Sequence, residues 1–116
     1  MRAVVFALLI APTLVMAQGV DGLYRPDADW AEDWDCRSVG QDGGAVEIRD
    51  GVFHGVEAQC KLTNPVSVRD MDATLYDAIC TGEGESWQAR LMIMDTAEGI
   101  VTLRDGGDVS RYISCN

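Results

Sequence analysis

Histidine and basic residues are scarce in this chain of 116 residues, which carries 9 Lys and Arg against 19 Asp and Glu. His54 is the single histidine, so a metal site built from several imidazoles is excluded. The net charge is −10, and the arginines are scattered along the chain. This pattern excludes a nucleic-acid binder that works by neutralising phosphates. The length suits one domain and not a multidomain enzyme.

Signatures of catalysis are also missing. There is no G-x-S-x-G pattern, and His54 lies beside Gly55 in a predicted strand, where a structural or surface role is the better interpretation. Glycosidase chemistry needs two carboxylates, for which Glu57, Glu83 and Glu85 are the candidates. A small barrel has little room for a sugar and for the apolar cleft that raises a carboxyl pKa. We therefore predict a protein that is not an enzyme and has no catalytic residues or cofactor.

Acidic residues crowd one short segment, which raises the question of calcium. The segment contains Asp27, Asp29, Glu32, Asp33 and Asp35. Calcium prefers oxygen ligands, but the D-x-[DN]-x-[DN]-G spacing of a calcium loop is absent and tryptophans interrupt the acids. A solvated acidic segment is the better interpretation, and no metal ligands are predicted.

Long apolar runs are confined to residues 1–17, which resemble a secretory signal peptide. Arg2 gives the positive start, and Val-Met-Ala at the end of the segment suits cleavage after Ala17. A spanning helix needs about 20 apolar residues, whereas Pro12 interrupts this run. Gln18, and not a cysteine, follows the cut, so a lipid anchor is not indicated. We expect a periplasmic or secreted protein with no stable membrane anchor after cleavage.

The predicted single domain, residues 18–116, contains all four cysteines: Cys36, Cys60, Cys80 and Cys115. An even number of cysteines in a short exported chain is typical of a disulfide framework. No C-x-x-C pair is present, which argues against a zinc ribbon and against a thioredoxin-like redox centre. Two disulfides are therefore predicted.

Spacing alone leaves three pairings of four cysteines open. We predict Cys36–Cys60 with Cys80–Cys115, because each bridge then closes a local half of the domain.

Residues 18–41 form an irregular acidic and aromatic lead-in without strand-like runs. Pro26 and the acids after it predict one short helix near Asp27–Trp34. Trp30 and Trp34 would share a face of that helix. Their rings either cover an open end of the core or form a surface that binds a partner.

Residues 45–115 alternate in polarity and are divided by turn residues, which predicts an antiparallel meander. Asp50-Gly51 is a strong hairpin signal. Gly55 suggests a bulge, and Asn64-Pro65 marks a break. The fold class is mainly β, with the meander curled into a small barrel or a strongly twisted sheet. The six predicted strands are AVEIR, VFHGVEAQCKL, ATLYDAIC, SWQARLMIM, IVTLR and VSRYISC.

Four motifs resemble those of a group of small exported proteobacterial proteins with no assigned activity. They are DWDC, the E-x-x-C that ends at Cys60, CTGEGESW from Cys80 to Trp87, and the closing Y-x-x-C. The resemblance implies export, a four-cysteine framework and a compact β fold. It brings no catalytic residues.

A looser similarity of plan is to the periplasmic inhibitors of c-type lysozyme, which are small exported β-barrels with disulfides. Those inhibitors insert a serine- and glycine-rich loop into the enzyme cleft. The corresponding turn in this chain, residues 82–86, shares only its glycines and Ser86 with that loop, and it carries Glu83 and Glu85.

These observations predict a non-enzymatic exported protein that binds a partner or assists a complex, such as a peripheral component of an envelope complex. Its partner would be another envelope or periplasmic protein, and a cationic one would suit the acidic surface. The candidate partner-binding residues are Trp30, Trp34, Glu83 and Glu85. The alternative is an inhibitor of a cationic hydrolase such as lysozyme.

Overall fold

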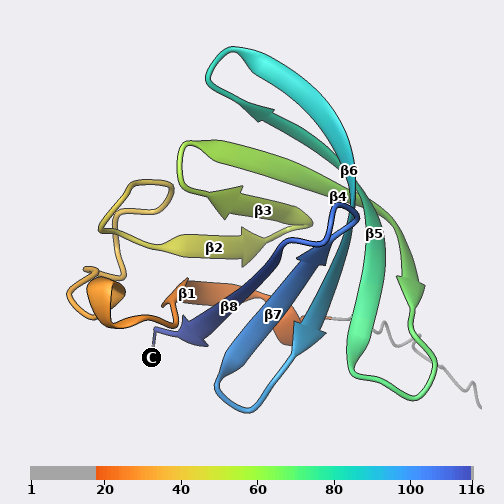
Figure 1. Ribbon diagram of the computed structural model, residues 1–116, viewed down its shortest axis with the longest axis horizontal. Helices are drawn as coiled ribbons and strands as arrows, with labels where there is room; N and C mark the ends of the chain where they lie inside the picture. The colour runs from red at the N-terminus through yellow and green to blue at the C-terminus, as the bar shows by residue number, and fades with distance from the viewer. Residues whose placement is uncertain (1–17, 116) are drawn as a thin grey trace, which may run out of the picture.

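Apolar residues at alternate positions fold the chain into a closed antiparallel barrel of eight strands (Figure 1). The computed structural model describes residues 18–115, so the predicted signal peptide lies outside the described residues. Two 3-10 turns, η1 (Gln18–Val20) and η2 (Asp29–Ala31), flank the first strand. The strands are β1 (Gly22–Pro26), β2 (Val46–Arg49), β3 (Val52–Gly55), β4 (Ala58–Ser67), β5 (Ala73–Gly82), β6 (Glu85–Asp95), β7 (Gly99–Arg104) and β8 (Val109–Ser114).

Each strand pairs with the next one along the chain, and β1 pairs with β8 to close the barrel. The predicted mainly β fold is confirmed, and the barrel is the form that it takes. Within residues 18–115 no helix is long and apolar enough to cross a membrane.

The barrel interior holds the core, to which β1, β2, β5, β6 and β7 all contribute buried side chains. At one end the chain itself covers this core. The Tyr24 hydroxyl donates a hydrogen bond to the carbonyl of Val20 in η1 at 2.6 Å. Burial, together with the nearby Asp95 and Asp21 carboxylates, raises the pKa of Tyr24 to about 12. The hydroxyl therefore stays protonated and holds η1 against this end. The buried core residues are Tyr24, Val46, Ile48, Ala78, Cys80, Leu91, Ile93 and Ile100.

The strands differ in length around the barrel. Strands β4 and β5 each have 10 residues and β6 has 11, whereas β2 and β3 have 4 each and β7 and β8 have 6 each. The long strands therefore project beyond their shorter neighbours, as the β5–β6 hairpin does at the top of Figure 1.

The prediction of six strands was wrong in two places. Strand β1 lies within the predicted irregular lead-in, since Gly22–Pro26 is held by partner strands on both sides. The single strand predicted through Gly55 is two strands, β3 and β4, in which Gly55 pairs with Ala58. Glu57 adopts a positive φ of 56°, and its N–H donates to the Gly40 carbonyl at 2.9 Å. The predicted bulge is thus a tight hairpin turn.

Of two further turn predictions, one is confirmed and one was wrong. The Asp50-Gly51 hairpin is confirmed, with positive φ at both residues. Asn64-Pro65 does not end its strand. It forms a bulge within β4, where the pairing with β5 shifts between Thr63 and Val66.

The predicted disulfide pairing was wrong. The bridges are Cys36–Cys115, with Cα atoms 5.9 Å apart, and Cys60–Cys80, with Cα atoms 3.9 Å apart. Cys60 and Cys80 are direct partners in the β4–β5 register, so their side chains meet across neighbouring strands. Barrel closure brings the end of the lead-in beside the chain that follows β8. Two disulfides are typical of an oxidising environment, extracellular or periplasmic.

The predicted helix is shorter than expected. Only Asp29–Ala31 forms a 3-10 turn, and Ala28, which precedes it, provides no side-chain cap. Ala31, the last residue of this turn, is fully buried.

Candidate functional site

The two predicted tryptophans lie together on the surface. Trp30 is 71% exposed, whereas Trp34 is half-buried. Their rings meet edge to face, with centroids 6.1 Å apart and an interplanar angle of 61°. The exposed Trp30 ring is thus held against a neighbour instead of moving freely. We call this pair and the acidic segment 27–35 the Trp30 surface.

Local hydrogen bonds fix the end of this surface. The Asp35 carboxylate accepts from the backbone N–H groups of Arg37 and Ser38 at 2.7 and 2.8 Å, and from the Ser38 hydroxyl at 2.6 Å. These bonds, led by the Ser38 hydroxyl, lower the pKa of Asp35 to about 2. Cys36 follows in a left-handed conformation, with φ of 57°, and is tied to Cys115.

The acidic segment does not gather its carboxylates around a point. Among residues 18–115, no group of three or more His, Cys, Asp or Glu side chains is arranged to hold a metal ion. The Asp35 carboxylate is instead engaged in its own turn.

The other predicted pair, Glu83 and Glu85, lies in the β5–β6 turn. Figure 1 places this turn well away from η2, so the structure does not join the two glutamates to Trp30. It brings them near Glu57 in the β3–β4 turn, beside the exposed Trp87. A side chain in place of Gly82 would come within 2.8 Å of the Glu57 carbonyl, which shows how closely the two turns approach. The three carboxylates form an acidic tip.

His54 is the single histidine of the chain. It lies half-buried in β3, where it pairs with Glu47 of β2 and Gln59 of β4.

A cavity of about 200 Å³, which the sequence reasoning missed, is lined by Trp87 and Leu91 of β6, whereas η1 lies beside Asp95 at the other end of that strand. The rings of Phe53 and Tyr112 meet edge to face there, with centroids 6.1 Å apart, and Trp87 also belongs to the lining. Burial raises the pKa of Tyr112, although the Ser110 hydroxyl and Arg104 act to lower it. We call this space the mouth cavity. The aromatic rings of the mouth cavity come from different strands, so no local sequence motif predicts the cavity.

An ion pair lies beside the mouth cavity. Arg104 Nη2 contacts Asp108 Oδ2 at 2.9 Å in the β7–β8 turn. The pair is exposed, so it adds little stability. It places two charged groups in the lining of a cavity that also contains the rings of Phe53, Trp87 and Tyr112.

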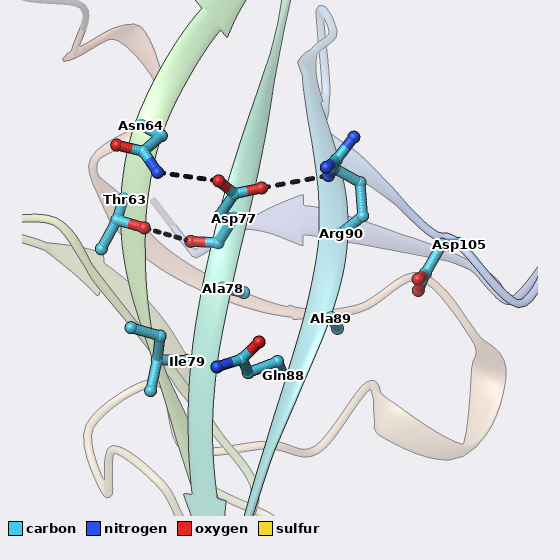
Figure 2. Close-up of a pocket in the computed structure, with 9 residues that line it drawn as sticks. All are labelled: Thr63, Asn64, Asp77, Ala78, Ile79, Gln88, Ala89, Arg90 and Asp105. Carbon is cyan, nitrogen blue, oxygen red and sulfur yellow. Dashed lines mark hydrogen bonds and ion pairs between the residues drawn. The ribbon is translucent and has the colours of Figure 1, made fainter.

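A second, open hollow of about 620 Å³ lies on the outer face of β4, β5 and β6 (Figure 2). Asp77 occupies its centre, where it contacts Arg90 Nε at 3.0 Å and accepts from Asn64 Nδ2 at 2.8 Å. Thr63 donates its hydroxyl to the Asp77 carbonyl at 2.7 Å. These polar groups therefore bind one another. Asp105 stands on the far side of β6 from Asp77.

Comparisons with known proteins add nothing to this geometry. A scan against protein-family models, a search of curated proteins and a search of solved structures each found no match to the chain. The function must therefore be inferred from its own residues.

Proposed function

We propose that this chain is a non-enzymatic exported protein that binds a cationic envelope or periplasmic protein through the Trp30 surface. The observation that carries the proposal is the ring of Trp30, which is 71% exposed and yet packed against Trp34. Tryptophan is among the residues that most often dominate binding energy at protein interfaces. An ordered ring loses less conformational freedom on binding than a mobile one.

The charge around this ring supports a basic partner. Five acids lie within residues 27–35, and the whole chain has a net charge of −10. Such a field attracts a positively charged surface and increases its association rate, an effect that salt screens. The acids would surround an apolar anchor, as polar rims surround the hot spots of interfaces.

The environment proposed for this binding follows from the disulfides and the leader. Both bridges suit an oxidising compartment. We propose that residues 1–17 direct export and are then removed, which leaves the barrel free in the periplasm or outside the cell.

A photo-cross-linking amino acid at position 30 tests the proposal in cells of the natural host. We expect a reproducible cross-linked protein. It should not form when salt is raised before irradiation. The matched control is the same amino acid at exposed Arg69, in the β4–β5 turn on the other side of the barrel. An identical pattern from both positions, or no cross-linked protein from position 30, would contradict a specific role for Trp30.

Inhibition of a cationic hydrolase such as lysozyme is the second candidate. The acidic tip favours it, because Glu57, Glu83 and Glu85 project together from two adjacent turns. A lysozyme assay with excess protein should then show reduced turnover, and Glu83→Gln with Glu85→Gln should weaken the effect. Unchanged turnover with the wild-type protein removes this candidate.

A further inference from the structure

Part of strand β6 has a neighbouring strand on one side only. Strand β7 pairs with β6 from Leu91 to Asp95, and β6 continues from Leu91 back to Glu85. On its other side, β6 pairs with β5 along its whole length up to Met94 without a register shift. No other strand of residues 18–115 pairs with the outer side of Glu85–Arg90. We call this stretch the β6 edge.

The backbone groups that the β6 edge presents can be assigned. The Arg90 carbonyl accepts a hydrogen bond from the Asp105 N–H at 3.0 Å, so the backbone of Arg90 faces the β7 side. Backbone groups alternate in direction along a strand. The N–H and C=O groups of Ser86 and Gln88 therefore face outward as well, whereas those of Trp87 and Ala89 face β5.

Protein sheets usually block such an edge, because unpaired backbone groups accept a further strand. The barrel does so at β4, which extends beyond β3 in the same way from Leu62 to Ser67. There a bulge interrupts the ladder, and Pro65 lacks an N–H. The β6 edge has neither a proline nor a bulge. The barrel is blocked at one of these edges and open at the other.

Space for side chains lies on both faces of the β6 edge. The mouth cavity lies on the inner face, where Trp87 and Leu91 belong to its lining. The outer hollow includes Gln88 and Arg90 on the opposite face. Side chains of an added strand would alternate between the two faces. On the inner face, an apolar side chain of the added strand would meet the aromatic rings of the mouth cavity. On the outer face, a side chain of the added strand would come near Asp105, which Figure 2 shows beside Ala89 and Arg90.

The charge near the β6 edge determines which charge an added strand should carry. Arg90, in the edge, and Arg104, which pairs with Leu91, each contact a carboxylate. No ion pair is formed at Asp105 by the residues between 18 and 115. Glu83 and Glu85 add negative charge at the turn end of the edge. A second copy of this chain, with its own net charge of −10, would be repelled.

We propose that the β6 edge binds an extended, positively charged segment of another protein as an additional strand, with an apolar side chain in the mouth cavity. The backbone groups of Ser86 and Gln88 provide affinity, and the mouth cavity provides selectivity, as in other cases of strand addition. This site is separate from the Trp30 surface and does not depend on it.

A short capped peptide in which Lys alternates with Val or Tyr is a direct probe. Titration into the full barrel, followed by amide NMR, should shift the signals of Ser86, Gln88 and Trp87 most strongly. A peptide of the same sequence with N-methyl groups on alternate amides cannot pair with an edge. We expect it to bind about tenfold more weakly or worse, since several hydrogen bonds are lost. Equal affinity of the two peptides would overturn the proposal, as would no shift at the β6 edge.

Two proline variants compare the two edges. Gln88→Pro removes an outward N–H from β6 but no bond to β5, so the barrel should fold while peptide affinity falls about tenfold. Ser67→Pro is the matched control on β4. Val68 N–H donates to the Ala73 carbonyl on the β5 side, so the N–H of Ser67 faces away from β5. Its affinity should stay unchanged, and equal losses in both variants would contradict an assignment to β6. If Gln88→Pro fails to fold, the N-methylated peptide decides the question with the wild-type protein.

Two further outcomes are distinguishable. Shifts at Ser86 and Gln88 that grow with protein concentration in the absence of peptide would indicate pairing between two copies, and would overturn the proposal of a cationic segment. Trp30→Ala should leave peptide affinity unchanged, since the Trp30 surface lies elsewhere. Loss of peptide binding in that variant would place the peptide on the Trp30 surface and contradict the β6 site.

Discussion

The β4 and β6 edges arise in the same way and differ in how they end. Each belongs to a long strand that continues past a short neighbour, β3 in one case and β7 in the other. Asn64 and Pro65 bend and block the β4 edge, whereas the β6 edge keeps a regular ladder with β5 up to the Gly82–Glu85 pair. Strand length thus creates an edge, and a few residues decide whether that edge can accept another strand.

The largest expected effect concerns the disulfides, of which one joins β4 to β5 and the other ties the lead-in to the chain after β8. Cys36–Cys115 spans 79 residues and Cys60–Cys80 spans 20. Loss of the first through Cys→Ala changes at both positions should lower the free energy of unfolding by about 4.5 kcal/mol, from the loop that it closes. The shorter loop contributes about 3 kcal/mol. Urea unfolding measures both. A loss below about 1 kcal/mol for Cys36–Cys115 would contradict this assignment of the bridges.

The two halves of β6 should differ in stability. Ile93 is 1% exposed in the half that pairs with both β5 and β7. Ile93→Ala should cost about 2–5 kcal/mol, because it removes buried methyl groups and leaves a cavity. Gln88→Ala in the β6 edge should change the free energy of unfolding by about 0.5 kcal/mol or less. Similar losses in chemical unfolding would mean that the β6 edge is covered.

Pro65 offers a smaller test at the other edge. Pro65→Thr should lower the free energy of unfolding by about 0.4–1 kcal/mol, because proline restricts the unfolded chain. It also returns an N–H to β4, so sedimentation at increasing concentration should show slightly more self-association. A more stable variant that remains monomeric would show that Pro65 does not protect the edge.

The smallest effect is the titration of Asp35. Its pKa is lowered from 3.8 to about 2 in the folded chain. The stabilising contribution of its carboxylate is therefore complete above about pH 4 and is lost as the pH falls through about 2. Carboxyl NMR should place the titration near pH 2 in the wild type and closer to 3.8 in Ser38→Ala. A wild-type value already near 3.8 would mean that the Asp35 turn is not formed.

Much of the fold could be predicted because its signals are local. Alternation in polarity and turn pairs such as Asp50-Gly51 act within a few residues, so they predict strands and hairpins directly. Strand β1 was missed because Gly22–Pro26 is extended through pairing with β2 and β8, both distant in sequence. No property of those five residues alone requires a strand.

The disulfide pairing depends on strand register, which the sequence patterns did not predict. A hairpin that turns near residue 70 places Cys60 opposite Cys80, but this requires β4 to continue through Asn64-Pro65. Since the sequence reasoning ended the strand there, the pairing could not follow from it. The partner of Cys36 depends on closure of the whole barrel, which no short segment determines.

The candidate site likewise has a part that local sequence spacing predicts and a part that depends on the whole fold. Trp30 and Trp34 were predicted to share a helix face; the turn ends at Ala31, yet their rings meet. The mouth cavity joins Phe53, Trp87 and Tyr112 from three strands, and the β6 edge depends on where β7 stops. Both are consequences of relative strand length and register, which single-sequence patterns do not give.

Amide hydrogen exchange along β6 tests the open edge most directly, because it needs no partner. Alternate amides face β5 and solvent between Ser86 and Ala89. We expect slow exchange at Trp87 and Ala89 and fast exchange at Ser86 and Gln88, with Leu91–Asp95 slow throughout. Uniform protection from Ser86 to Asp95 would show that the edge is already covered and would contradict the account.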